Sequence, residues 1–333
     1  MQAYSEIERQ VLTSLQRGIE PVARPFEGLS LPAVEVVELI RRAQEEGLIR
    51  RFGAVFDARR LGYKSILCAL ETPAAEIAAK AEIVSGEPGV THCYERRPLD
   101  GGSNYPALWF TLALLHDEFE EGLERMRHQL ETPGSRLWEL PALRRFKIDV
   151  VFDLRTVDRD ETFPGAVPAA EFSDAEAFRA YSETERRIVR AIDQQIPISE
   201  TPFTELAASL GVAEQELLDI LREWRRAGVL RRIAAVLRHR EAGFKANAMC
   251  VWPVAGDILE AGRIMAAQPE VTHCYQRPRS SAVPFDLYAM IHTESWESTR
   301  ALFEDLTARG GLSEGEMFAS IREFKKSSMK YFS

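Results

Sequence analysis

The segment Gly89-Val-Thr-His-Cys-Tyr-Glu-Arg-Arg-Pro98 decides the fold, because the chain contains it a second time as Glu270-Val-Thr-His-Cys-Tyr-Gln-Arg-Pro278. The run Val-Thr-His-Cys-Tyr is identical in the two copies, and an arginine follows at the same distance. His92 and His273 are 273 − 92 = 181 residues apart, and the tyrosines and arginines share this offset. Such close repetition of a polar segment indicates an internal duplication and marks the segment as a candidate site.

The alternation of side chains along this segment predicts which residues act together. In a β-strand, successive side chains point to opposite faces of the sheet. His92, Tyr94 and Arg96 would then share one face, while Thr91 and Cys93 share the other. An acid/base group, a phenol and a fixed cation on one face favour a functional site over simple packing.

The duplication extends outward to two helical segments that open alike. Tyr4-Ser-Glu-Ile-Glu-Arg and Tyr181-Ser-Glu-Thr-Glu-Arg each place a serine three residues before a glutamate, the spacing of a capping box. The second copy continues through 205–211 into a helix from about 212 to 226, a helix-turn-helix pattern with Gly211 at the turn. The first copy is four residues shorter here, because the offset rises from 177 to 181, so its middle helix must be cut short.

Both helical segments end in a glycine, Gly47 or Gly228, followed by an apolar strand. Each half then shows the order strand, helix, strand, strand, helix, strand, which predicts a ferredoxin-like βαββαβ unit. In the first half we expect these elements near 63–71, 74–85, 89–97, 106–115, 117–130 and 145–154. In the second half we expect them near 244–253, 256–268, 270–277, 285–293, 295–308 and 318–326.

The predicted fold class is therefore α+β, with two tandem copies of a winged helix-turn-helix plus a ferredoxin-like domain related by a pseudo-twofold. The expected domains are a degenerate helix-turn-helix (1–50), a first ferredoxin-like domain (51–155), a linker (156–180), a second helix-turn-helix (181–231) and a second ferredoxin-like domain (232–333). Both helices of such a unit pack on one face of its sheet. We expect the open faces of the two sheets to cover each other, so that the two copies of the repeated segment border one cavity.

Composition and charge narrow the class of protein. The chain is 45% hydrophobic and 28% charged, has no apolar run long enough to span a membrane and shows no secretory signal, so we expect a cytoplasmic protein without a membrane partner. Its four cysteines have neither CxxC nor zinc-ligand spacing, so we expect reduced thiols and no metal site. The net charge of −9 argues against general attraction to nucleic acid.

The order helix-turn-helix then ferredoxin-like sheet resembles the Lrp/AsnC transcription regulators, which dimerise through those sheets. Particular strings resemble a narrower family with this layout, the siroheme decarboxylases. These strings are 51–57 (RFGAVFD), 89–97 (GVTHCYERR), 104–110 (NYPALWF) and 286–292 (DLYAMIH). Two features depart from that family: His-Cys-Tyr stands where it commonly has His-Asn-Tyr, and Ala107 and Asp286 stand where it tends to have asparagine.

The resemblance implies an enzyme that removes carbon dioxide from two acetate side chains of siroheme to give didecarboxysiroheme in haem biosynthesis. It implies siroheme as the partner and no cofactor beyond this iron tetrapyrrole, whose macrocycle can accept the electrons. The catalytic candidates are His92, His273, Tyr94 and Tyr275. The substrate-binding candidates, arginines for carboxylates and aromatic rings for the macrocycle, are Arg50, Arg51, Arg96, Arg97, Arg231, Arg232, Arg277, Trp109 and Tyr288. The sequence leaves open which half is productive, whether a histidine ligates the iron, and whether chains associate further.

Other interpretations stand beside this one. A single histidine on a strand is more often structural than catalytic, and aromatic residues such as Trp109 and Tyr288 more often form a core than a platform for a tetrapyrrole. A DNA-binding regulator would need cations at the start of its reading helices, but Glu35, Glu214 and Glu216 stand there, so we expect no DNA binding. A haem-sensing or haem-binding protein is the third alternative. His239 and His292 are weaker site candidates, and His116 and His128 are expected on the surface.

Overall fold

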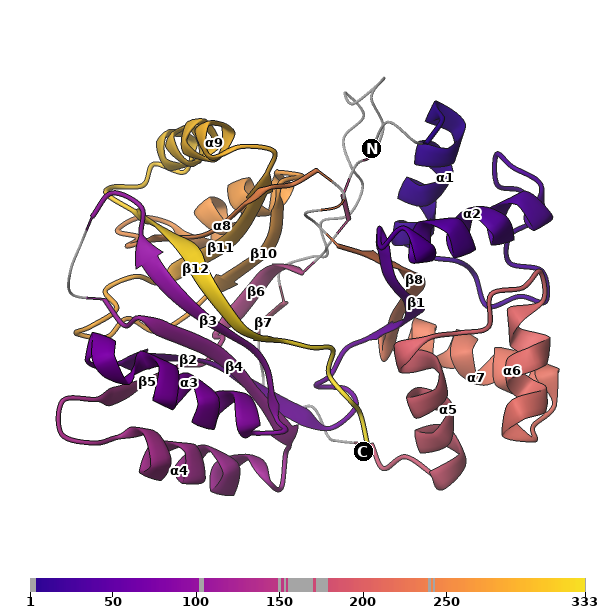
Figure 1. The fold of residues 1–333 in the computed structure, drawn as a ribbon, viewed down its shortest axis with the longest axis horizontal. Helices are drawn as coiled ribbons and strands as arrows, with labels where there is room; N and C mark the ends of the chain where they lie inside the picture. Colours follow the sequence, from indigo (N-terminus) through magenta and orange to yellow (C-terminus); the bar gives the residue numbers. More distant parts are fainter. Residues whose placement is uncertain are drawn as a thin grey trace.

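The computed structural model describes residues 4–101, 105–148, 151–152, 154, 170–171, 179–238, 241 and 243–332. It has two lobes (Figure 1): the helix-turn-helix segments of both halves form one, and the sheets of both halves form the other. The duplication has therefore not produced two separate bodies in series. Like parts from the two halves pack together instead.

The helical lobe joins α1 (Glu6–Arg17) and α2 (Ala33–Glu45) to α5 (Glu183–Gln194), α6 (Pro202–Leu210) and α7 (Glu214–Arg226). Both predicted capping boxes are present, at the starts of α1 and α5. Gly47 and Gly228 follow α2 and α7 with φ of 78° and 71°, a conformation that favours glycine. The first copy has no helix between α1 and α2, because turns and bends occupy 21–32, so its middle helix is missing rather than shortened.

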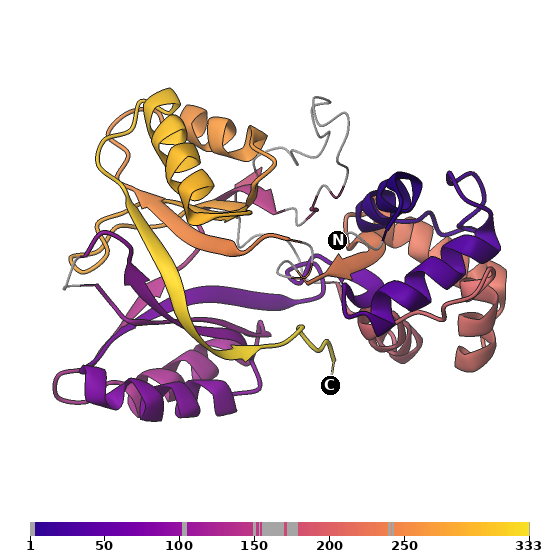
Figure 2. The same cartoon turned by 45° about the horizontal axis from the view of Figure 1, so that its top comes forward.

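Between the lobes lies a two-stranded ribbon in which β1 (Ile49–Phe56) pairs antiparallel with β8 (Leu230–Leu237) (Figure 2). These are the apolar strands expected directly after Gly47 and Gly228. They pair with each other, and their apolar residues belong to the core of the helical lobe. The expected domain boundaries at 50/51 and 231/232 thus fall inside this ribbon.

The second lobe contains both predicted βαββαβ units. The first consists of β2 (Tyr63–Glu71), α3 (Ile77–Gly86, after a 3-10 turn at Ala74–Glu76), β3 (Val90–Pro98), β4 (Leu108–Leu115), α4 (Phe119–Leu130) and β5 (Arg136–Leu140). The second consists of β9 (Ala246–Trp252), α8 (Ile258–Ala267), β10 (Val271–Gln276), β11 (Leu287–Thr293), α9 (Trp296–Arg309) and β12 (Glu316–Lys326). Their strands run in the spatial orders β5-β2-β4-β3 and β12-β9-β11-β10, and β3 pairs with β12 to join the two sheets.

The last strand of the first unit differs from the expectation at 145–154. The strand that completes this unit is β5, and the next strand, β6 (Arg144–Ile148), crosses to pair with β10 of the second half. In the second half one long strand does both tasks: β12 pairs with β9 at its start and with β3 along most of its length. Only three residues separate β5 from β6, so the strand order returns to its beginning and the two sheets close around a shared interior.

The faces of the sheets are used as predicted. Cys93 and Cys274 lie in the two cores beneath the helices, α3 and α4 on one side and α8 and α9 on the other. A separate core between the sheets contains residues of both halves, among them Trp109, Tyr288 and Phe318. The open faces therefore cover each other. All four cysteines are buried and unpaired.

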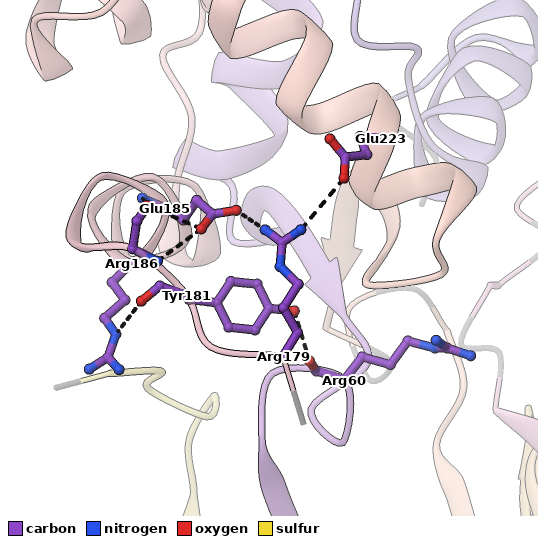
Figure 3. A network of polar contacts seen from close by, with 7 residues as sticks. Arg60, Arg179, Tyr181, Glu185, Arg186 and Glu223 are labelled. Atoms are coloured by element: carbon purple, nitrogen blue, oxygen red, sulfur yellow. Dashed lines mark hydrogen bonds and ion pairs between the residues drawn. The ribbon is translucent and has the colours of Figure 1, made fainter. Parts of the chain in front are cut away.

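The predicted linker at 156–180 lies almost wholly outside the described residues, which include 170–171 (β7, paired with β6) and 179–180. Beyond it, a polar network ties the second helix-turn-helix to the first half (Figure 3). The Tyr181 hydroxyl donates to the Arg60 carbonyl at 2.7 Å, and Arg179 bridges Glu185 and Glu223. Among the described helices, none is long and apolar enough to cross a membrane.

Candidate functional site

The repeated segments form β3 and β10, which direct equivalent side chains toward the space between the sheets. Tyr94 pairs across the strands with Trp109, and Tyr275 pairs with Tyr288. These cross-strand partners, Trp109 and Tyr288, belong to the core between the sheets. Residues directly opposite each other on paired strands lie on the same face of the sheet. His92, Tyr94 and Arg96 and their three counterparts thus face inward in both halves.

Each histidine is oriented by the threonine that precedes it. The Nδ1 atom of His92 lies 2.9 Å from Thr91 Oγ1, and Nδ1 of His273 lies 3.0 Å from Thr272 Oγ1. Each imidazole also lies beside the tyrosine two residues on, with ring centroids 6.1 Å and 6.5 Å apart. Because Thr91 contacts Nδ1 of His92, the Nε2 atom of His92 is the one that faces a reaction partner.

The arginines of the repeated segment stack on the same tyrosines. The guanidinium of Arg96 lies 5.1 Å from the centre of the Tyr94 ring, and that of Arg277 lies 5.0 Å from Tyr275. The two differ in their hydrogen bonds. Arg277 donates to the Leu140 carbonyl and leaves its buried Nε atom without a hydrogen-bond partner among the described residues. Arg96 is only 7% exposed, and the atom that it leaves without such a partner is Nη1.

A buried guanidinium without a carboxylate is costly, since desolvating a charge is offset only by pairing and hydrogen bonding. Burial lowers the pKa of Arg96 to about 10, so the group is still charged at neutral pH. Among the described residues no carboxylate pairs with it. An anionic ligand would supply the missing partner.

The β1–β8 ribbon contributes one arginine to each side. Arg50 lies close enough to Tyr94 for their charges to interact, and Arg231 stands in the same relation to Tyr275. Burial lowers the pKa of Arg50, and the nearby Arg238 lowers it further. The Nε atom of Arg50 is buried and lacks a hydrogen-bond partner in the described structure.

Three predicted arginines lie elsewhere. Arg51 donates to the carbonyls of Ala54 and Asp193, so it fastens β1 to the end of α5. Arg232, its counterpart, lies against Gly18 at the end of α1. Arg97 is exposed and pairs with Glu95 at 2.9 Å. The structure therefore does not bring these three together with the histidines.

The two aromatic candidates are part of the inter-sheet core. Trp109 is 2% exposed and donates from Nε1 to the Pro106 carbonyl at 2.7 Å. Tyr288 is 4% exposed, and its hydroxyl has no hydrogen-bond partner among the described residues. Both rings are packed as core residues, and the Tyr288 hydroxyl is a further buried polar group near Arg277.

The electrostatics of the site set the charge of its groups. Burial lowers the pKa of His92 to about 4, and the charges of Lys326, Arg50, His273 and Arg96 act in the same direction. The two halves therefore bring their histidines near enough to repel each other when charged. Burial also raises the pKa of Tyr94 to about 12, so this phenol keeps its proton and can donate a hydrogen bond.

The amino-acid sequence alone did not predict four charged residues around the site: Asp57, Arg145, Arg238 and Lys326. Asp57 accepts from Arg231 at 2.6 Å and from Arg145 at 3.2 Å, while Lys326 and Arg238 lie on the side of His92. None of them is identical between the two halves, although Asp57 ends the quoted string 51–57. Asp57 could have been found by comparing the two halves for differences in charge, because Arg238 occupies the equivalent position in the second half.

The other histidines have different surroundings. His292 is buried, with Nδ1 at 3.2 Å from Thr272 Oγ1 and its ring against Phe152. His239 lies outside the described residues. Within the described part of the chain, no group of three or more histidine, cysteine, aspartate or glutamate side chains is placed to hold a metal ion.

The helices that would read DNA are engaged within the protein. Acidic residues occupy the first turns of α2 and α7, as expected. Arginines later in these helices bind the opposite copy: Arg41 donates to the Ile198 carbonyl at 2.7 Å, Arg222 donates to the Pro21 carbonyl at 3.1 Å, and Arg225 pairs with Glu20. These cations hold the two helical copies together.

Comparison with known proteins agrees with this geometry. A family model described as the AsnC-like ligand binding domain matches residues 60–147 and 241–325, and one described as the siroheme decarboxylase NirDL-like HTH domain matches 185–231. A siroheme decarboxylase of Hydrogenobacter thermophilus is 35% identical over 330 residues, 97% of this chain and 94% of that protein. The chain belongs to the siroheme decarboxylase family.

Further members of this family match most of the chain in sequence or in structure. A NirDL subunit of Paracoccus pantotrophus is 33% identical over 300 residues, 87% of this chain and 86% of that subunit. The crystal structure of the siroheme decarboxylase NirDL has a TM-score of 0.70 and 31% identity, covering 99% of this chain and 95% of that one. A second structure of NirDL, in complex with an iron-uroporphyrin III analogue, has a TM-score of 0.68.

Proposed function

We propose that this protein is a siroheme decarboxylase, which removes carbon dioxide from two acetate side chains of siroheme to give didecarboxysiroheme in haem biosynthesis. The observation that carries the proposal is the buried guanidinium of Arg96 beside His92, in a chain that belongs to this family along its whole length. Siroheme is an iron tetrapyrrole with eight carboxylates. Its carboxylates supply what this arginine lacks.

Binding would use the inward-facing arginines. Arg50 and Arg96 each have a buried nitrogen without a hydrogen-bond partner in the described structure, and guanidinium groups bind carboxylates through paired hydrogen bonds. Tyr94 can donate a further hydrogen bond from its protonated hydroxyl. These groups fix one acetate of the substrate beside the imidazole of His92.

The reaction is redox-neutral. The bond between the acetate methylene carbon and its carboxylate breaks, carbon dioxide leaves, and the electron pair of that bond is delocalised into the macrocycle. A proton then adds to the methylene carbon, which becomes a methyl group. We propose that the macrocycle serves as the electron acceptor, so that no other cofactor takes part.

His92 would supply this proton. In the protein alone its imidazole is neutral at pH 7, because burial and neighbouring cations depress its pKa. Substrate carboxylates bound to Arg50 and Arg96 would offset these charges and raise the pKa, so that His92 acquires a proton from solvent. A positioned imidazolium near a reacting carbon is an effective general acid.

The test is an anaerobic incubation of the purified protein with siroheme, followed by mass spectrometry of the tetrapyrrole. We expect a product that has lost two molecules of carbon dioxide. His92→Ala should lower turnover by roughly 10²- to 10⁴-fold, as expected for removal of a general acid. Folded protein that binds siroheme and leaves it unchanged would contradict the proposal and favour a haem-binding role.

A further inference from the structure

The backbone has the same arrangement on the two sides of the site, so their side chains can be compared position by position. The Asp57 amide donates to the Val229 carbonyl at 2.9 Å, and the Arg238 amide donates to the Leu48 carbonyl at the same distance. Val229 and Leu48 are themselves repeat equivalents (229 − 48 = 181, and 238 − 57 = 181). Asp57 and Arg238 therefore occupy equivalent places in the two halves.

On the side of His273 this place holds a buried anion. The Asp57 carboxylate lies 2.6 Å from Arg231 and 3.2 Å from Arg145, with side-chain exposures of 12%, 21% and 13%. Although burial alone would raise the pKa of Asp57, the charges of Arg231 and Arg145 lower it, so the carboxyl is ionised. Both arginines bind this internal carboxylate beside Tyr275.

On the side of His92 the charges are exchanged. Arg238 replaces Asp57, and Glu323 replaces Arg145, since Glu323 pairs with Tyr94 across the strands as Arg145 pairs with Tyr275. Glu323 is exposed and lies 4.0 Å from Lys326. Arg50, the counterpart of Arg231, has no carboxylate partner among the described residues and hydrogen-bonds to Ser328 Oγ at 3.3 Å.

We propose that only the His92 side accepts the reacting carboxylate, and that Asp57 occupies the equivalent position on the His273 side as a built-in anion that excludes a substrate carboxylate. This inference rests on the proposed function, and it assigns the productive half. The duplicated site has become asymmetric through two exchanges of charge: aspartate against arginine at 57 and 238, and arginine against glutamate at 145 and 323. The ligand is a polycarboxylated iron tetrapyrrole held with one carboxylate at Arg50 and Arg96.

The test compares the matched variants Arg50→Gln and Arg231→Gln by titration with iron uroporphyrin, followed through the absorbance of the porphyrin. Arg50→Gln removes a cation that has no internal carboxylate, so we expect affinity to fall by about 10- to 100-fold. Arg231→Gln removes a cation already paired with Asp57. We expect its loss of affinity to be smaller by about tenfold or more, and equal losses would overturn the inference.

Three further variants keep the test independent of the folding of Arg231→Gln. Asp57→Asn frees Arg145 and Arg231 from their carboxylate, so we expect iron uroporphyrin to bind about tenfold more tightly, as for one additional charge-assisted hydrogen bond. Unchanged or weaker binding would count against the built-in anion. In the anaerobic siroheme assay, His92→Gln should reduce turnover at least tenfold more than His273→Gln, and the reverse order would assign the other half.

These outcomes separate the two proposals. If the unmodified protein neither binds iron uroporphyrin nor converts siroheme, the proposed function fails. If it does both and the paired variants lose affinity and turnover equally, the function stands and the asymmetry is refuted.

Discussion

At the scale of single residues, Arg96 is the side chain whose structural cost is hardest to explain without a ligand. It is buried, charged and stacked on Tyr94, and no carboxylate in the described structure pairs with it. Replacing such an ion by an apolar residue of similar volume is often neutral or stabilising. The residue therefore fits a binding role better than a structural one.

The corresponding prediction concerns Arg96→Met. We expect the variant without ligand to be at least as stable as the unmodified protein in urea denaturation, because a desolvated charge is removed. We expect its affinity for iron uroporphyrin to fall by about 10- to 100-fold. Arg263→Met, which removes an exposed arginine on α8, is the matched control and should change neither quantity. A strongly destabilised Arg96→Met with normal affinity would assign Arg96 to the fold.

His92 makes a prediction about stability and pH. Its pKa is about 4 in the folded protein and about 6.5 in an unfolded chain, so the unfolded state binds the extra proton. Stability from this group is therefore complete above pH 6.5 and falls as the pH drops toward 4, by up to ~3 kcal/mol. Urea denaturation between pH 7.5 and 4.5 should show a steeper loss for the unmodified protein than for His92→Gln. Parallel curves would mean that His92 titrates normally.

The same residue predicts proton uptake on binding. Carboxylates placed beside Arg50 and Arg96 raise the pKa of His92, so the protein should take up a proton when it binds iron uroporphyrin near pH 6. Calorimetry in two buffers with different ionisation enthalpies measures this uptake. His92→Gln should abolish most of it, and equal uptake by the two proteins would place the proton elsewhere.

At the scale of elements, α5 packs against β1 and the end of α1 packs against β8, and the glycine that allows each close contact stands in a different place. The end of α5 lies so close to β1 that a Cβ atom on Gly53 would meet the Ile192 carbonyl oxygen at 2.7 Å. In the other copy, Ala234 stands at the strand position and the glycine is Gly18, at the end of α1. Each close approach therefore has one glycine, on the strand in one copy and on the helix end in the other.

We accordingly predict that Gly53→Ala destabilises the protein by about 1–3 kcal/mol, because the new methyl group meets backbone atoms that cannot move independently. Gly86→Ala is the control: it lies in the last turn of α3, where nothing stands within 4 Å of an added Cβ. Alanine should be neutral or stabilise this helix by up to ~1 kcal/mol. Thermal unfolding of both variants measures the contrast, and a neutral Gly53→Ala would mean that β1 and α5 shift apart readily.

The elements also show where local pattern was informative. The alternation of side chains along the strand correctly predicted that Cys93 lies beneath the helices and His92 on the opposite, inner face, because neighbouring residues of a strand point to opposite faces of the sheet. Local pattern could not show that β1 pairs with β8 or that β6 crosses to β10, since these partners lie more than a hundred residues away. The short strand β5 was also missed, because its assignment depends on its pairing with β2 rather than on its own sequence pattern.

The residues of the site also divide into those that the sequence pattern predicted and those that depend on distant partners. The repeated residues His92, Tyr94 and Arg96 were found because identity between the halves marks them. Asp57 was not found, because its importance comes from Arg145 and Arg231, which reach it from other strands. Comparing the halves for their differences in charge, as well as for their identities, would have drawn attention to it.

At the scale of the whole molecule, the two halves are interlocked rather than placed side by side. In the described part of the chain, strands of the two halves pair at three places: β3 with β12, β10 with β6 and β1 with β8. The two halves also share the core between the sheets.

The last prediction follows from this interlocking. A specific protease site inserted within residues 156–169 should allow the chain to be cut without separating the halves, because none of the three strand exchanges depends on that connection. We expect the cut protein to elute as one particle in size-exclusion chromatography and to keep its activity on siroheme. Each half produced alone should aggregate or pair with itself, since residues such as Trp109 and Tyr288 would be uncovered. Dissociation of the cut halves at micromolar concentration would instead mean that the peptide connection, rather than the shared sheets, holds the site together.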